Sequence, residues 1–431
     1  MSDVSFRIHT YGCKVNTYDS GLLASRLGKD GFTLSKEHPQ VHILNTCAVT
    51  KEATREAVRT ARRLKSRDPL ALVVVTGCAA QVDTEEFTHV PGVDLVVANS
   101  HKGQLEDLIR KYYSGQLKDR VHKSNIFKKE DLEGGGGAES EHTRAFLKIQ
   151  DGCNSFCTFC VIPFARGKSR SLPVDQIVRR ARELFAAGHQ EIVLTGVHIA
   201  DYRDGQLVLE DLVEAVLENT EVPRIRLSSL EPGEVSERLL DMYSDRRLCP
   251  HFHMSIQSAN TKVLFDMKRQ YTADAVTYSL EEIARRVPDA FVGMDVIAGF
   301  PGEGDEEFLD SYRRLERLPW TRLHVFPYSQ RPGTFATRRS DQVHPAQIKK
   351  RAQMLRELSE KRWQASAAKQ IGRVKAGLTL KDGRLLSRDY WPIQVDASDL
   401  PRNQELQIEI KGIQGDHLVG AHIDARLPLG L

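Results

Sequence analysis

Residues 151–171, DGCNSFCTFCVIPFARGKSRS, contain three of the seven cysteines of this 431-residue chain. Cys153, Cys157 and Cys160 form a C-x3-C-x2-C pattern directly after an expected strand, FLKIQ. Three thiolates can hold three irons of a [4Fe–4S] cluster and leave the fourth iron open to a small molecule. The alternatives are a zinc loop or unrelated core cysteines. A zinc site needs a fourth ligand close by, and the nearest histidine in the sequence, His142, precedes the strand.

The composition restricts the class of protein. A chain of this length suggests two or three domains. The N-terminal stretch MSDVSFRIHTYGC has no basic segment followed by an apolar one, and no run approaches the ~18 apolar residues of a membrane span. We therefore expect a cytoplasmic protein whose cysteines are free, catalytic or metal-bound. The net charge is only +3, so contact with nucleic acid requires local clusters of basic residues.

Residues 142–367 alternate expected strands with amphipathic helical segments. The strands are FLKIQ, EIVLTG, IRLSSL, HFHMSIQ, FVGMDVIAGF and RLHVFPY. Six βα units predict a partial (β/α)6 barrel, since a complete barrel has eight, and active sites of such barrels lie at the carboxyl ends of the strands. The preceding stretch 129–141, KEDLEGGGGAESE, predicts a flexible linker.

Residues 1–128 predict an α/β domain with a doubly wound parallel sheet, because short apolar strands alternate with helices. Cys13, Cys47 and Cys78 each follow one of its first three strands, SFRIHTYG, VHILNT and ALVVVTG. Carboxyl ends of parallel strands share one edge, where ligands of open α/β sheets bind. We infer a second three-cysteine cluster with an open iron. The alternative is three small buried residues that fill strand ends.

Residues 368–431 alternate apolar and polar positions and contain the turn signals K-D-G and Q-G-D, which predicts a small OB-like β-barrel. Basic and acidic residues roughly balance in this segment, whereas a nucleic-acid module usually has a basic face. Contact with RNA would depend on a few residues, which could equally be solvated surface: Lys381, Arg384, Arg388 and Trp391.

The cysteine loop resembles the signature of the radical S-adenosylmethionine (SAM) superfamily, in which an aromatic residue, here Phe159, precedes the last cysteine. The stretch 294–303, MDVIAGFPGE, is similar to the segment that contacts adenine in that superfamily, although a Gly-rich turn is also ordinary loop geometry. A family Gln-Ser-Gly motif has alanine at Ala259, which leaves open whether that backbone needs a positive φ. The resemblance implies SAM contacts from Phe159, Thr195, Gly196, Gln257, Ile297 and Gly299.

GCKVNTYDS, NTCAVT and TGCAAQ resemble the N-terminal domain of the methylthiotransferases, and the resemblance extends over all three domains, the last of which is similar to the RNA-binding TRAM domain. The variants at 14–16 and 48–50, with LHVFPYSQRPGT at 323–334, resemble the MtaB branch. That branch adds a methylthio group to C2 of N6-threonylcarbamoyladenosine-37 in tRNA. The alternatives are isopentenyladenosine-37, a ribosomal-protein aspartate, or a non-catalytic iron–sulfur RNA-binding protein.

The resemblance also implies a mechanism and partners. SAM at the first cluster would be cleaved by one electron, and the resulting radical would remove hydrogen from C2 of the adenine. Sulfur would arrive through the second cluster, and a second SAM would donate the methyl group. The implied cofactors are therefore two [4Fe–4S] clusters and SAM. The implied partners are tRNA, an electron donor such as flavodoxin or ferredoxin, and a sulfur source, without a membrane.

Substrate RNA needs positive charge near the active site. The expected helix 52–67 is basic, although most charge runs are only solvated faces. It carries Arg55, Arg59, Arg62, Arg63, Lys65 and Arg67, and the cysteine loop adds Arg166, Lys168 and Arg170. His251 and His253 alternate along one strand and are expected to point into the barrel, unless they are ordinary core histidines. Cys249 stands outside both triplets and is expected to be a buried non-ligand.

Overall fold

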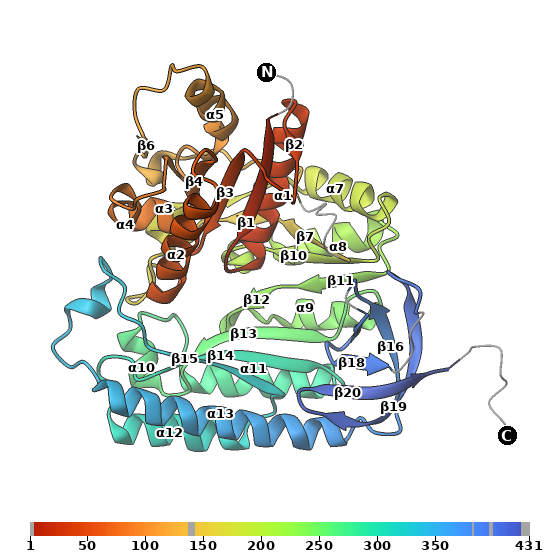
Figure 1. Ribbon diagram of the computed structural model, residues 1–431. Coiled ribbons are helices and arrows are strands. Elements are labelled where there is room, and N and C mark those ends of the chain that lie inside the picture. Colours follow the sequence, from red (N-terminus) through yellow and green to blue (C-terminus); the bar gives the residue numbers. More distant parts are fainter. Residues whose placement is uncertain (1–3, 137–142, 382, 396–399, 424–431) are drawn as a thin grey trace.

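Figure 1 shows the computed structural model, which describes residues 4–136, 143–381, 383–395 and 400–423. The N-terminal sheet lies above a central set of strands, and a small barrel flanks the central strands at one side. Both larger parts have parallel sheets, as the sequence predicts. None of the described helices is long and apolar enough to cross a membrane.

The N-terminal part is a parallel sheet in the order β2-β1-β3-β4-β5-β6. Its strands are β1 (Ser5–Thr10), β2 (Thr33–Leu34), β3 (Val41–Thr46), β4 (Leu72–Gly77), β5 (Leu95–Ala98) and β6 (Val121–His122). Its helices are α1 (Lys14–Lys29), α2 (Lys51–Arg67), α3 (Cys78–Val82), α4 (Thr84–Thr88) and α5 (Leu105–Tyr113). Every residue of β3, β4 and β5 is buried, as expected for strands covered on both faces. The edge strands β2 and β6 were not predicted, because two residues carry no periodic signal.

The central strands form two parallel sheets, β11-β10-β7 and β12-β13-β14-β15. Their bounds are β7 (Arg144–Lys148), β10 (Glu191–Thr195), β11 (Arg224–Leu227), β12 (Ser229–Leu230), β13 (His251–Gln257), β14 (Phe291–Ala298) and β15 (Arg322–Pro327). All six expected strands are present. The third, IRLSSL, is divided at Ser228, whose backbone N–H bonds to Leu194 rather than continuing a strand. A short antiparallel pair, β8 (Gln150–Asp151) and β9 (Arg170–Ser171), frames the cysteine loop.

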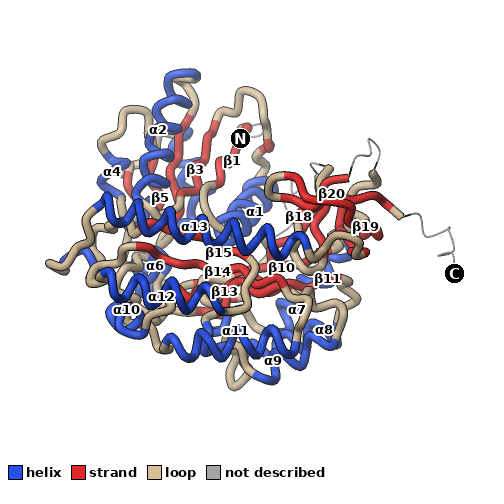
Figure 2. The backbone as a smooth tube through the Cα atoms, turned by 90° about the horizontal axis from the view of Figure 1, so that it is seen from below, coloured by secondary structure: helices blue, strands red, loops and turns tan. Residues whose placement is uncertain are grey.

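Helices cover the outer face of the central strands, as Figure 2 shows from below. They are α7 (Val174–Ala186), α8 (Leu209–Asn219), α9 (Glu237–Asp241), α10 (Thr261–Asp266), α11 (Ala273–Arg286), α12 (Asp305–Arg317) and α13 (Pro345–Ala368). The short helix α6 (Ile162–Arg166) instead packs against α3 of the N-terminal part. Outward-facing β13 residues such as Phe252 and Met254 join one apolar core with these helices. The alternate β13 residues therefore face the interior.

The C-terminal part is a closed barrel in the order β16-β17-β18-β20-β19. Its strands are β16 (Val374–Thr379), β17 (Leu385–Ser387), β18 (Pro392–Val395), β19 (Glu405–Gln414) and β20 (His417–His422). It is anchored at the amino ends of β10 and β11, where buried Arg224 bonds to Glu191, Glu405 and the Leu386 carbonyl. Arg226 likewise donates to Glu191 and to the Arg388 carbonyl. The barrel thus lies at the end of these strands that is opposite to their carboxyl ends.

The described part of the expected linker, 129–136, is attached to both larger parts rather than hanging free. The Gly136 N–H donates to the Tyr18 hydroxyl at 3.1 Å, and Arg180 donates to the Gly136 carbonyl at 3.0 Å. Arg26 pairs with Glu133 at 2.7 Å. These contacts hold the stretch against both larger parts, and its flexibility stays a prediction. The remainder of the linker and its neighbours, 137–142, lie outside the described residues.

Candidate active site

The loop after β8 brings Cys153, Cys157 and Cys160 together. A nitrogen donor lies at each sulfur: the Ser155 backbone 3.5 Å from Cys153 Sγ, Arg269 3.2 Å from Cys157 Sγ, and the Ile162 backbone 3.4 Å from Cys160 Sγ. Burial and the neighbouring Cys157 raise the pKa of the free Cys160 thiol to about 12. Donors at every sulfur suit thiolates bound to a cationic cluster, in which the charge of each sulfur is compensated.

A histidine that the sequence did not point to lies beside this loop. His198 Nδ1 is 4.0 Å from Cys153 Sγ, while its Nε2 bonds to Glu234. The pKa of Cys153 is below its ordinary value, because hydrogen bonds to His198 and Ser155 outweigh burial, which raises it. The argument from His142 considered distance along the sequence only, and the loop after β10 places His198 beside Cys153 from 45 residues away.

Three of the residues expected to contact SAM, Phe159, Ile297 and Gly299, lie close together beside this loop. Phe159 meets Phe300 edge-to-face at 6.3 Å, and Ile297 packs against the same small apolar cluster. The positive φ of Gly299 begins the turn that carries Phe300. Glu303 accepts the Gly299 N–H at 3.2 Å and pairs with Arg351 of α13 at 3.0 Å. Burial raises the pKa of Glu303 to about 7 against the attraction of Arg351.

The loop after β10 is held by Gln150 of β8. Its side-chain oxygen accepts the N–H groups of Val197 and His198 at 3.1 and 2.9 Å, and its amide donates to the Gly152 carbonyl at 2.7 Å. Gln150 therefore joins the segment of Thr195 and Gly196 to the cysteine loop. Thr195 itself is buried.

The turn after β13 shows whether the backbone at Ala259 needs a positive φ. The positive φ, +61°, occurs at Gln257, whereas Ala259 has none. A left-handed conformation costs a non-glycine residue about 1–2 kcal/mol, so it persists where the surroundings fix it. Alanine at position 259 therefore causes no backbone strain in this turn.

The second set, Cys13, Cys47 and Cys78, stands at the carboxyl ends of β1, β3 and β4. Burial raises the pKa of Cys47 to about 12, and the neighbouring Cys78 and Cys13 thiols add to this rise. Cys13 is exposed and occupies the N-cap position of the 16-residue helix α1. The three thiols are thus neighbours at one sheet edge, as the strand-end spacing predicts.

Two glycines permit this close approach. Gly12 has φ +91°, and a Cβ there would lie 2.6 Å from both Cβ and Sγ of Cys47. Gly77 has φ +95°, and a Cβ there would lie 2.4 Å from the Thr46 carbonyl. A larger residue at either position would push the cysteine-bearing turns apart.

Arg166, at the end of α6, links the segment that follows the first cysteine set to the second set. Its guanidinium donates to Cys78 Sγ at 3.2 Å, to Asp151 at 2.9 Å, to Asn16 at 2.6 Å and to Asp19 at 3.1 Å. The preceding residues of α6 pack in the apolar core of the N-terminal sheet. The prediction that Arg166 contacts RNA is therefore wrong, because the side chain is only 3% exposed and its guanidinium makes four hydrogen bonds inside the protein.

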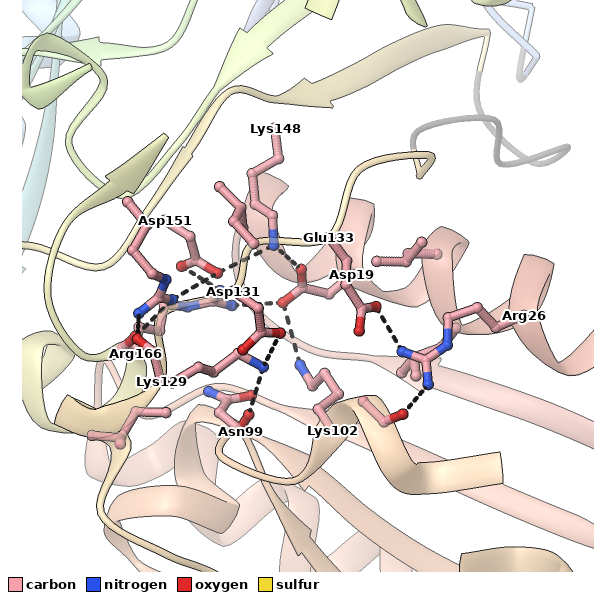
Figure 3. A pocket seen from close by; sticks show the side chains of 16 residues that line it. Asp19, Arg26, Asn99, Lys102, Lys129, Asp131, Glu133, Lys148, Asp151 and Arg166 are labelled. Carbon is pink, nitrogen blue, oxygen red and sulfur yellow. Dashed lines mark hydrogen bonds and ion pairs between the residues drawn. The ribbon is translucent and has the colours of Figure 1, made fainter. Parts of the chain in front are cut away.

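Figure 3 shows the buried ionic network to which Arg166 belongs. Lys148 donates to Asp19 at 2.6 Å and to Asp151 at 3.2 Å, and Lys102 donates to Asp19 at 3.2 Å. The pKa of each carboxyl is held far below its ordinary value: burial opposes this shift, but the surrounding Lys and Arg cations outweigh it. The network joins α1 to β7, β8 and α6, so it fixes the N-terminal sheet against the central strands.

Other expected RNA contacts are also used internally. Arg170 donates to the carbonyls of Lys129 and Arg166. Arg388 donates to the carbonyls of Pro223 and Arg246 and pairs with Glu405, which docks the barrel. Trp391 is buried against Phe291 and Trp363. The predictions that Arg170, Arg388 and Trp391 contact RNA are therefore wrong. The sequence could not reveal this, because most of the residues that they contact are distant in the sequence.

Lys65 is held by Asp94 at 2.8 Å. The other expected RNA-binding residues are exposed and stay predictions: Arg55, Arg59, Arg62, Arg63, Arg67, Lys168, Lys381 and Arg384. His251 and His253 share the interior face of β13, as predicted. Cys249 is fully buried, also as predicted.

Residues 147–315 match the radical SAM superfamily, and residues 5–98 match Uncharacterized protein family UPF0004. The threonylcarbamoyladenosine tRNA methylthiotransferase MtaB of Aquifex aeolicus is 36% identical over 89% of this chain and 95% of its own length. The chain belongs to the methylthiotransferase family of radical SAM enzymes. The MtaB protein of Rickettsia prowazekii is 33% identical to this methylthiotransferase, over 95% of the chain and 96% of its own length.

One further relative and one solved structure are also similar to this chain. The tRNA-2-methylthio-N(6)-dimethylallyladenosine synthase of Ruegeria pomeroyi is 33% identical over 88% of each chain. Among solved structures, the radical S-adenosylmethionine methyltransferase TsrM of Kitasatospora setae, with cobalamin and a [4Fe–4S] cluster bound, matches with a TM-score of 0.59 and 15% identity over 78% of this chain and 77% of its own. That match concerns the fold alone.

Proposed function

We propose that this methylthiotransferase adds a methylthio group to C2 of N6-threonylcarbamoyladenosine-37 in tRNA. The supporting observation is the contact between the two cysteine-bearing parts, where Arg166, six residues after Cys160, donates to Cys78 of the second set. The full-length similarity to relatives named for this modification supports the substrate.

The cysteine geometry suits two iron–sulfur clusters. Cys153, Cys157 and Cys160 would hold one [4Fe–4S] cluster, and a second would be held by Cys13, Cys47 and Cys78. When bound, these clusters and SAM supply the one-electron and sulfur chemistry that an unactivated adenine C–H bond requires. The chain's own part is to orient and shield. His198 and Arg269 fix two sulfurs of the first loop, and Arg166 fixes one sulfur of the second set.

We assign SAM to the expected contact residues, which lie in the cysteine loop or at the carboxyl ends of the central strands. The assignment is supported by the position of these residues at one end of the central strands. They are Phe159, Thr195, Gly196, Gln257, Ile297 and Gly299. Gln150 and the Glu303–Arg351 pair hold two of these segments in place, so we count them as positioning residues.

The finer architecture follows the same proposal. We interpret the central strands as a partial (β/α)6 barrel, open between β7 and β15, with residues 142–367 as its domain. Residues 1–128 form the domain of the second cluster. The five-stranded C-terminal barrel, 368–431, is an OB-like TRAM module that binds tRNA, with Lys381 and Arg384 as exposed candidates and Lys168 beside the cysteine loop. The remaining partners are a flavodoxin- or ferredoxin-type electron donor and a sulfur source in the cytoplasm.

The test is mass spectrometry of nucleosides from total tRNA of cells with and without this gene. We expect loss of 2-methylthio-threonylcarbamoyladenosine and a rise of its precursor. Loss of the dimethylallyl derivative instead would keep the chemistry and overturn the substrate. Unchanged tRNA, with an active protein, would overturn the tRNA proposal. Complementation with Cys78→Ala and, as a control, Cys249→Ala separates loss of a cluster ligand from loss of an ordinary buried cysteine.

A further inference from the structure

Three phenylalanine rings gather at the surface beside the cysteine loop. Phe156 belongs to the loop itself, Phe164 to α6, and the half-buried Phe127 to a short 3-10 helix, Ile126–Lys128, of the N-terminal part. Their ring centroids lie 5.9 to 6.1 Å apart in all three pairs. Phe156 is 37% and Phe164 43% exposed, so this cluster, which we call the phenylalanine patch, presents apolar surface to solvent. Single exposed rings are ordinary, whereas several in mutual contact mark an interaction site.

The backbone does not account for the exposed ring at position 156. Phe156 has a φ of +47°, in the left-handed region that glycine or asparagine adopts at lower cost. An exposed aromatic side chain on a strained backbone is unfavourable for folding alone. Strain of this kind occurs where function requires it, so the ring points to a contact outside the chain.

The phenylalanine patch lies between the two cysteine sets. Helix α6 begins at the first set, where the Ile162 backbone nitrogen is 3.4 Å from Cys160 Sγ. It ends at the second set, where Arg166 Nε is 3.2 Å from Cys78 Sγ. Phe164 is the middle residue of this five-residue helix, so along the chain it is two residues from a contact to each set. A partner seated on its ring would therefore be close to ligands of both sets.

The two aromatic rings of the cysteine loop point to different surroundings. Phe159 meets Phe300 at 6.3 Å and packs with Ile297, among the residues expected to contact SAM. Phe156 instead packs against the other two rings of the phenylalanine patch. A base that must reach SAM would lie on the side of Phe159. The patch is thus available to a partner that only needs to come close to the cysteine sets.

The surface around the phenylalanine patch is basic. The segments that carry its rings, 121–129 and 152–170, contain no Glu, and their one Asp-free stretch of chain continues through both. The two segments touch, since a Cβ on Gly167 would lie 2.7 Å from the Ile126 carbonyl oxygen. Their exposed charged residues are all lysines, which pair with no carboxylate among the residues that the structure describes: Lys123, Lys128 and Lys168. The charge of this surface therefore suits an acidic partner.

We propose that the phenylalanine patch is the docking surface for the electron donor, a small acidic protein of the flavodoxin type. This inference rests on the proposed function, because such a donor supplies the one electron that cleavage of SAM consumes. Opposite charges speed the encounter, and a few exposed rings give the small contact area that is typical of transient electron-transfer complexes. A donor seated here would hold its flavin beside α6, between the two cysteine sets.

Exposed rings flanked by lysines also suit single-stranded RNA, whose bases stack on aromatic side chains. RNA is therefore the alternative outcome of the test. The position of Phe164 between the two cysteine sets favours the donor, because closeness to both sets matters for electron transfer and not for holding an RNA strand.

The first measurement is the affinity of the cluster-loaded full chain for a purified bacterial flavodoxin, by isothermal titration calorimetry at low and at physiological salt. Phe164→Ser should weaken binding about tenfold, as expected for an anchor ring. Lys128→Glu should weaken it severalfold and reduce its dependence on salt. The matched controls, Tyr278→Ser on α11 and Lys361→Glu on α13, change an exposed ring and an exposed lysine and should bind as the wild-type protein does. Unchanged affinity in both Phe164→Ser and Lys128→Glu would overturn the docking surface.

The second measurement compares two reductants in SAM cleavage. With subsaturating reduced flavodoxin, Phe164→Ser should cleave SAM about tenfold more slowly than the wild-type protein. Dithionite is a small reductant that needs no docking surface, so with it both proteins should react at the same rate. An equal loss with both reductants would overturn the docking role. Lys128→Glu changes only an exposed side chain, so it keeps the test decisive if Phe164→Ser fails to fold.

Two controls separate this inference from its alternatives. Anticodon stem-loop RNA should bind Phe164→Ser and Lys128→Glu as tightly as the wild-type protein. A loss of RNA affinity with donor affinity retained would overturn the proposal in favour of an RNA surface. Methylthiolation of tRNA driven by dithionite tests the proposed function separately. Its absence overturns that function, whereas equal donor affinities in wild-type and variant proteins overturn the docking surface alone.

Discussion

Arg166→Met should destabilise the contact between the N-terminal sheet and the central strands. The substitution removes the cation that bonds to Asp151 and Asp19 at 2.9 and 3.1 Å and leaves both carboxylates buried. Breaking one partner of a buried ion pair costs about 3–5 kcal/mol. Lys148 still bonds to both carboxylates, so we expect the lower end, about 3 kcal/mol in the free energy of unfolding. At about 2–4 °C per kcal/mol, the Tm should fall by about 6–12 °C.

The assay is scanning calorimetry of the reconstituted full chain at neutral pH. Arg179→Met is the matched control, because Arg179 forms an exposed i,i+4 pair with Asp175 whose loss should cost about 0.5 kcal/mol or less. Arg166→Lys keeps the charge without the fork of donors and should fall between the wild-type protein and Arg166→Met. A decrease for Arg166→Met no larger than that for Arg179→Met would refute the conclusion that this network holds the two parts together.

Three further results are expected. Folding lowers the pKa of Asp19 and of Asp151, so as the pH falls the unfolded state takes up protons on them before the folded state does. Their contribution to the free energy of unfolding should therefore persist from pH 7 to about 4 and be lost as the pH falls through the lowered pKa values. Acid unfolding followed by circular dichroism should begin at a higher pH in Arg166→Met than in the wild-type protein. Gly12→Ala should lose roughly half of the bound iron, since its Cβ would meet Cys47, whereas Gly31→Ala, at a similar φ of +86° in open space, should keep it; equal iron contents would contradict the clash. Cys249→Ala should also keep its iron, while Cys157→Ala should lose roughly half, and iron loss from Cys249→Ala would remove its assignment as a non-ligand.

The cysteine sets and the order of strands could be read from the sequence because both are local signals. Apolar strands followed by helices specify a parallel sheet, and parallel strands bring their carboxyl ends to one edge. Cys13, Cys47 and Cys78 become neighbours for that reason alone, although they are up to 65 residues apart. The cysteines of the C-x3-C-x2-C loop are much nearer to one another in the sequence, so the short chain between them is enough to keep their thiols together.

The basic residues could not be assigned in the same way, because the role of a charge depends on partners that are distant in the sequence. Arg166 belongs to a stretch that reads as an exposed basic loop, yet its acceptors Asn16 and Asp19 lie about 150 residues away and remove it from solvent. Arg388 belongs to a segment that predicts a barrel surface, yet it donates to the carbonyls of Pro223 and Arg246, which lie 165 and 142 residues away. Local sequence patterns thus determine which thiols come together. The burial of each charge, in contrast, is decided only when separate parts of the chain pack and exclude water between them.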